Sequence, residues 1–93
     1  MNIGLLYVEL FLPGCNSLKE KRMIVKSLKD RVKNKFNVSI AEVEYQDKWQ
    51  RAGIAVVTVS ESRKYTDETL NKVFRFFDEG FGFELIKHEF EYR

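Results

Sequence analysis

The chain has 93 residues, a net charge of +2 and 44% hydrophobic residues, which suits one small domain with its own core. Its single cysteine excludes an internal disulfide and is typical of a reducing compartment, and no apolar run approaches the roughly 18 residues that a membrane span needs. The apolar start has no basic residue ahead of it, so we interpret it as a strand, not a signal peptide, and expect a cytoplasmic protein.

Residues 2–12 are predicted to form a strand whose two faces are both largely apolar. One face carries Leu6, Val8, Leu10 and Leu12, and the other carries Ile3, Leu5, Tyr7, Glu9 and Phe11. Pro13-Gly14 ends the strand. Ser17 begins a helix, because SLKE at 17–20 is a capping box in which Ser17 accepts the amide proton of Glu20. The core stripe of this helix is Leu18, Val25, Leu28, Val32 and Phe36.

Two strands, a helix and a last strand follow. Residues 37–46 and 53–61 are the strands, and the change of parity between Ile40 and Val43 indicates a bulge or burial on both faces. The helix is predicted from about Thr66 to Glu79, with Asp67 and Glu68 at its positive end, Gly80 beyond its C-terminus, and a core stripe of Leu70, Val73, Phe74 and Phe77. In the last strand, residues 83–92, one face is Ile86, His88, Phe90 and Tyr92, and the other is Leu85, Lys87, Glu89 and Glu91.

The element order βαββαβ predicts an α+β fold in one domain, residues 1–93. We expect a ferredoxin-like sandwich: a four-stranded antiparallel sheet with both helices on one face. The open face then carries either Leu5, Tyr7 and Phe11 or Leu6, Val8 and Leu10. Because a large apolar face is unusual on a monomer, we expect a homodimer through it. The alternative is that polar residues keep the face wet, namely Glu9, Thr58, Ser60 and Lys87.

The charge is concentrated in the first helix. Residues 17–36 contain eight basic and two acidic residues, a net +6, so the rest of the chain carries −4. Five of the cations step by three and four residues and fall in one helical stripe: Lys19, Arg22, Lys26, Lys29 and Lys33. The stripe is about 21 Å long at a rise of about 1.5 Å per residue. Such a stripe suits a polyanion, although a solvated helix face is the alternative.

Catalytic patterns are weak. Cys15 and His88 are the only residues of their kinds, which does not favour a Cys-His pair or a transition-metal site, and no cofactor is expected. The segment GCNSLKEKR, residues 14–22, shares only its first glycine and last arginine with the phosphate loop of acylphosphatases, which have the same element order. The second glycine of that loop is missing, so an acylphosphatase-like hydrolase is a minor alternative. The third strand, RAGIAVVTV, lacks the aromatic residues with which an RNA-recognition motif stacks bases.

Three motifs together resemble the YlxP-like family of small bacterial proteins. They are SLKEKR at 17–22, NVSIAEV at 37–43 and QDKWQRA at 46–52. The resemblance covers nearly the whole chain, with one departure at Gly53, where the family often has one more residue after the alanine. It implies a ferredoxin-like domain whose genes often lie beside those for ribosome-binding factor A and translation initiation factor two. No catalytic residue is implied.

Two interpretations of QDKWQR stay open. In the structural one, Trp49 packs over the sheet edge or a partner subunit, and Gln46, Asp47 and Gln50 satisfy the loop backbone. In the functional one, Trp49 and Arg51 contact a base or a protein.

We therefore expect a cytoplasmic, non-enzymatic accessory protein of translation or ribosome assembly. Its expected partner is rRNA or a ribosomal subunit, and its expected contact residues are Lys19, Arg22, Lys26, Lys29, Lys33, Trp49 and Arg51. The alternative is a dimeric module that docks on an acidic protein.

Overall fold

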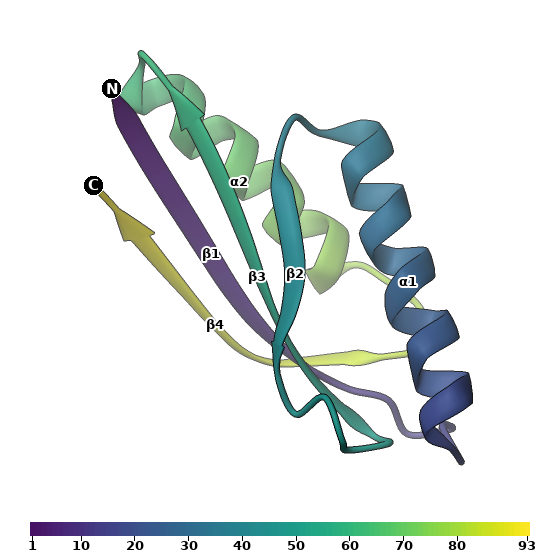
Figure 1. The fold of residues 1–93 in the computed structure, drawn as a ribbon. Helices are drawn as coiled ribbons and strands as arrows, with labels where there is room; N and C mark the ends of the chain where they lie inside the picture. The colour runs from purple at the N-terminus through teal and green to yellow at the C-terminus, as the bar shows by residue number, and fades with distance from the viewer.

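The computed structural model describes residues 1–93 and contains six elements in the predicted order. They are β1 (Asn2–Phe11), α1 (Leu18–Lys35), β2 (Ser39–Glu44), β3 (Arg51–Ser60), α2 (Arg63–Asp78) and β4 (Glu84–Tyr92). The strands form one antiparallel sheet in the order β2-β3-β1-β4, so that β1 and β3 are central and β2 and β4 are edges (Figure 1). This is the predicted ferredoxin-like α+β sandwich.

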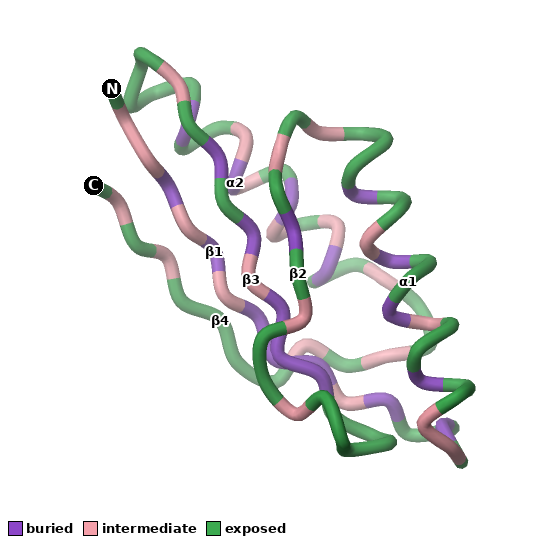
Figure 2. Tube along the Cα trace, viewed as in Figure 1, coloured by how far each residue is buried: buried purple, intermediate pink, exposed green.

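Both helices cover the same face of the sheet, because their apolar stripes share one core with alternate residues of the central strands (Figure 1). From β1 this core takes Leu6, Val8 and Leu10, and from β3 it takes Ile54 and Val56, all fully buried. The two possibilities for the open face are thereby resolved: it carries Leu5, Tyr7 and Phe11 from β1, and Val57 and Val59 from β3. Figure 2 shows buried positions alternating with intermediate ones along the first part of β1, and with intermediate or exposed ones along the second half of β3.

The start of α1 is as predicted. Ser17 is the N-cap, and its hydroxyl accepts the amide proton of Glu20 at 3.1 Å. Glu20 reaches back to the amide of Asn16, at 3.4 Å, one residue before the cap. Of the predicted stripe, Val25, Leu28 and Val32 are buried, whereas Leu18 and Phe36 are half-buried.

The predicted start of α2 was wrong, whereas its predicted end lies within one residue of the observed one, Asp78. The helix begins at Arg63, three residues earlier than expected, because Ser62 is the N-cap and accepts the amide proton of Tyr65 at 3.2 Å. The first turn consequently contains no acidic residue. Gly80 is not needed for a left-handed C-cap, since the cap is Glu79 with φ −99°. Its lack of a side chain instead leaves room for the ring of Phe83, which a Cβ at this position would strike.

Two β-bulges shape one end of the sheet. The first lies in β2 at Val43, between the pairs Glu42–Ile54 and Glu44–Gly53, and confirms the bulge predicted from the parity change. The second lies in β4 at Ile86, between the pairs Glu9–Lys87 and Leu10–Leu85. It was not predicted, and it moves Ile86 off the face of His88 and onto the open face beside Phe11.

None of the helices is long and apolar enough to span a bilayer.

Candidate nucleic-acid interface

The basic flank of α1, which we define as Lys19, Arg22, Lys26, Lys29 and Lys33, lies on the surface of the helix. Four of the five side chains are exposed, and that of Lys29 is half-buried. The apolar stripe of α1 faces the sheet, and Arg31, on the opposite flank, lies 4.9 Å from the ring of Phe76 in α2. The basic flank is therefore turned away from α2.

Most of the basic flank has no counter-charge. Only Lys26 forms an ion pair, with the exposed carboxylate of Asp30 at 2.8 Å. The hydrogen bond between them raises the pKa of Lys26 and lowers that of Asp30, so both stay charged near neutral pH. Lys19, Arg22, Lys29 and Lys33 form no ion pair within 4 Å. The charges of these four cations are therefore not neutralised within the chain.

Lys21 is the exception among the cations of α1, because it is completely buried. Its ammonium lies 2.6 Å from Glu42 Oε2 and also donates to the backbone carbonyl of Tyr45. Apart from Lys21, this buried oxygen of Glu42 has no polar partner. Tyr45 itself has φ 62°, the left-handed region that few non-glycine residues adopt. Lys21 thus fixes the start of the β2–β3 hairpin to α1.

The far side of the hairpin is fixed to the loop before α1. The backbone carbonyl of Gln50 accepts from the amide of Leu12 at 2.8 Å. Its side-chain Nε2 donates to Cys15 O at 3.3 Å and to Pro13 O at 3.5 Å. The three motifs noted in the sequence therefore converge at one end of the sheet: Lys21 from the first, Glu42 from the second and Gln50 from the third.

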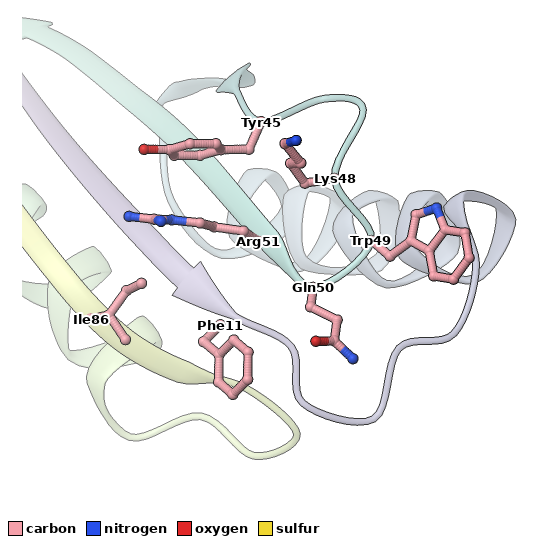
Figure 3. A pocket seen from close by; sticks show the side chains of 7 residues that line it. All are labelled: Phe11, Tyr45, Lys48, Trp49, Gln50, Arg51 and Ile86. Atoms are coloured by element: carbon pink, nitrogen blue, oxygen red, sulfur yellow. The ribbon is translucent and has the colours of Figure 1, made fainter.

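An open hollow of about 490 Å³ lies beside this hairpin (Figure 3). Its lining consists of Phe11, Tyr45, Lys48, Trp49, Gln50, Arg51 and Ile86. Trp49 is 53% exposed and projects away from the pair formed by Tyr45 and Arg51 (Figure 3). The structural interpretation of QDKWQR therefore holds for Gln50, but Trp49 is not packed over the sheet edge, and Gln46 and Asp47 form no side-chain hydrogen bond.

A buried carboxylate holds Arg51 in place. Glu9, 5% exposed, accepts a hydrogen bond from Tyr7 Oη at 3.1 Å and from Arg51 at 3.3 Å, and the Arg51 guanidinium lies 4.4 Å from the centre of the Tyr45 ring. Burial by itself raises the pKa of Glu9, but hydrogen bonds from Tyr45, Tyr7 and Arg51 outweigh it and lower that pKa. Burial, followed by the bond to Glu9, raises the pKa of Tyr7 to about 12.

Gly53 makes this cluster possible. It pairs with Glu9 in the sheet, and a Cβ on it would lie 2.5 Å from Tyr7 Oη and 2.6 Å from Glu44 Cβ. The phenol of Tyr7 therefore occupies the space that a side chain would take. The same end of the sheet thus presents Arg51 and Tyr45 in one fixed arrangement.

Cys15 and His88 have separate neighbours. The buried thiol of Cys15 donates to Ser17 O at 3.4 Å, whereas the imidazole of His88 lies against the ring of Phe74, with centroids 4.6 Å apart. No group of three or more His, Cys, Asp or Glu side chains is arranged to hold a metal ion.

Sequence reasoning missed two parts of this site. Lys21 was considered only in the charge count of residues 17–36, although its spacing from Val25, Leu28 and Val32 places it in the core stripe, which was the available signal. The cluster around Glu9 was also missed, because it joins residues up to 42 positions apart and no local pattern records it.

Comparison with known proteins agrees with the motifs. Residues 3–90 match the model of a family described as "Protein of unknown function (DUF503)". The chain belongs to this family. It is also 46% identical over 76 residues to a Bacillus subtilis (strain 168) protein named "Uncharacterized protein YlxP", a match that covers 82% of this chain and 83% of that protein. The resemblance to the YlxP-like family is thereby confirmed, and since neither description gives an activity, the function has to be argued from the site.

Proposed function

We propose that this protein is a cytoplasmic, non-enzymatic accessory protein of translation or ribosome assembly that contacts rRNA through the basic flank of α1. The observation that carries the proposal is a row of five cations on one rigid helix, four of them without an ion-pair partner. Such a row suits a phosphate backbone, because each neutralised phosphate releases condensed counterions. The gene neighbourhood implied by the YlxP-like resemblance favours rRNA among polyanions.

The test is co-sedimentation of the purified protein with ribosomal subunits on sucrose gradients. The variant Arg22→Glu, Lys26→Glu, Lys33→Glu reverses three exposed cations of the basic flank, and its binding should be lost. The matched control is Lys64→Glu, Lys72→Glu, Arg75→Glu, which reverses three exposed cations on α2 and should bind like the wild type. For about four phosphate contacts, affinity should fall roughly 50-fold between about 50 and about 200 mM salt. Equal binding by both variants would refute the role of α1.

The alternative partner for the same flank is an acidic protein. The two possibilities differ in one simple respect, since only an RNA-mediated complex depends on intact RNA. Material captured by the immobilised protein is treated with nuclease, and the charge-reversal variant is run beside it. Capture that survives nuclease and is lost in the variant would favour the acidic protein.

Hydrolysis of acyl phosphates is not favoured by the loop between β1 and α1. The amide of Cys15 donates to Leu12 O at 3.2 Å, and that of Asn16 donates to the Glu20 carboxylate at 3.4 Å. Both amides are thus engaged, and the carboxylate would repel a phosphate. A hydrolysis assay on a small acyl phosphate tests this alternative directly.

The open sheet face is proposed to bind a second copy of the chain. Its apolar part lies at the end of the sheet away from the hairpin and consists of Ile3, Leu5, Ala55, Val57 and Val59, of which Val59 is 59% exposed. The β4 charges beside it are paired within the chain, Lys87 with Glu89 and Arg93 with Glu91. A matching partner surface must therefore be apolar and neutral, and the same face of another copy meets that need.

The oligomeric state decides this point. Light scattering behind size exclusion should give the mass of a dimer, and Val57→Lys with Val59→Lys should give a monomer. Both side chains are exposed on the sheet, so the fold should survive the change. A monomeric wild type at all concentrations would contradict the dimer and leave the RNA contact untouched.

A further inference from the structure

The side chains that line the hollow beside the β2–β3 hairpin suit a planar, aromatic ligand. Phe11 and Ile86 form its apolar side, and the Arg51 guanidinium and Trp49 flank it (Figure 3). Its volume of about 490 Å³ leaves room for a ring system, and the exposed Trp49 is among its lining residues. Rings and guanidinium groups are the surfaces on which nucleobases stack.

The charge of the hollow suits a ligand that carries phosphate. Lys48 and Arg51 are both exposed, and no acidic side chain is among the lining residues. The carboxylate that contacts Arg51, that of Glu9, is almost fully buried and already accepts hydrogen bonds from Tyr7 and Arg51. Its charge is therefore compensated, while Lys48 forms no ion pair.

Gln50 supplies a hydrogen-bond acceptor of known orientation. Its Nε2 donates to two carbonyl oxygens, those of Cys15 and Pro13, and only the amide nitrogen can do so. The side-chain oxygen must therefore point the other way, toward Phe11 (Figure 3). A base that offers an N–H donor would satisfy this oxygen, either through an exocyclic amino group, as in adenine, or through a ring N–H, as at N3 of uracil.

We propose, on the basis of the RNA contact proposed for α1, that this hollow binds one unpaired nucleobase, with an N–H of the base directed at the side-chain oxygen of Gln50. The base would lie against Phe11 and Arg51, with Trp49 at the rim and Lys48 beside its phosphate. The single strand would continue along the basic flank, because Lys21 and Gln50 fix the hairpin against α1 and the loop before it.

Trp49 allows a direct test, since it is the only tryptophan of the chain. Three RNA oligonucleotides of equal length are titrated into the protein: oligo(A), oligo(U) and an abasic chain. Oligo(A) should quench the fluorescence of Trp49 and bind about tenfold more tightly than the abasic chain, with oligo(U) between them. The abasic chain should bind through α1 without quenching.

Variants separate this site from the basic flank. With fluorescein-labelled oligo(A), Trp49→Leu should weaken binding about tenfold, and the control Tyr65→Leu, an exposed aromatic on α2, should not. Equal affinity for oligo(A) and the abasic chain, without quenching, would overturn the base site and leave the role of α1 standing. If all binding is lost only in the α1 charge-reversal variant, the base site and the role of α1 are both supported. If none of the three chains binds to the wild type, both proposals are overturned.

Discussion

The ammonium of Lys21 lies 2.6 Å from the carboxylate of Glu42, and the lysine side chain is completely buried. The two residues belong to α1 and to the edge strand β2, and Glu42 directly precedes the bulge at Val43. Glu42 faces the helices because it pairs with Ile54, a core residue of β3. A charged pair therefore occupies a place in the core and ties the hairpin to the helix.

Replacing one member of this pair should destabilise the fold strongly. Lys21→Met leaves the buried Oε2 of Glu42 without its only polar partner and should cost about 3–5 kcal/mol in the free energy of unfolding, measured by urea denaturation. The double variant Lys21→Met, Glu42→Leu should recover much of this loss, because no charge is then left alone. If Lys21→Met were as stable as the wild type, the pair of Lys21 and Glu42 would not contribute to the stability of the fold. Lys26→Ala, which breaks the exposed pair with Asp30, should change stability little.

The Glu9 cluster should make the free energy of unfolding depend on pH in the acidic range. The pKa of Glu9 in the folded state lies below its ordinary value of 4.5, so the carboxylate stabilises the fold above that pH, and the contribution is lost as the pH falls through the folded-state pKa. Glu9→Gln should therefore be less stable than the wild type at neutral pH. Urea denaturation at several pH values should show the difference shrinking on acidification below about 4.5. A difference that is constant with pH would exclude this origin.

Gly53→Ala should disturb the same cluster. The added methyl would lie 2.5 Å from Tyr7 Oη, so the phenol must leave its hydrogen bond to Glu9. We expect a loss of about 1–3 kcal/mol in the free energy of unfolding. In a Tyr7→Phe background the loss should be smaller, since the oxygen that is struck has been removed, although the contact with Glu44 Cβ persists. Equal losses in both backgrounds would show that Tyr7 is not involved.

The true start of α2 can be checked at Ser62. Ser62→Ala removes the hydroxyl that caps the helix and should cost about 1 kcal/mol in thermal or urea unfolding. Glu68→Ala, in the middle of the helix and exposed, should have little effect. The opposite ranking would indicate a helix that begins near Thr66, as its acidic residues suggested.

The elements themselves could be predicted because each has a local signal. Capping at Ser17, alternation in β1 and the parity change in β2 all act within a few residues. The bulge at Ile86 has no such signal, because Leu85 and Ile86 are both apolar and either can face the core. The cap at Ser62 was not predicted because Tyr65, three residues later, does not complete a capping box. The hydrogen bond from the Tyr65 amide to the Ser62 hydroxyl is nevertheless sufficient to cap the helix.

The candidate site was predictable only in part. The basic flank follows from spacing within one helix, so it was visible in the sequence. The partners of Arg51 were not, because Glu9 lies 42 residues away and meets it only once β1 and β3 have paired in register. The burial of Lys21 was not predicted for a general reason: lysine is rarely buried, and composition gives no hint of an acidic partner in the next element, β2.

The bond from Lys21 to the carbonyl of Tyr45 has a consequence for affinity. It holds the hairpin and the basic flank in a fixed relation, so in the proposed RNA complex the two would bind one strand together. A strand that contacts both the hairpin and the basic flank loses its translational and rotational entropy only once. The second contact then forms at a high effective concentration. Avidity of this kind is set by geometry, so a strand too short to reach from the hairpin to α1 would gain none of it.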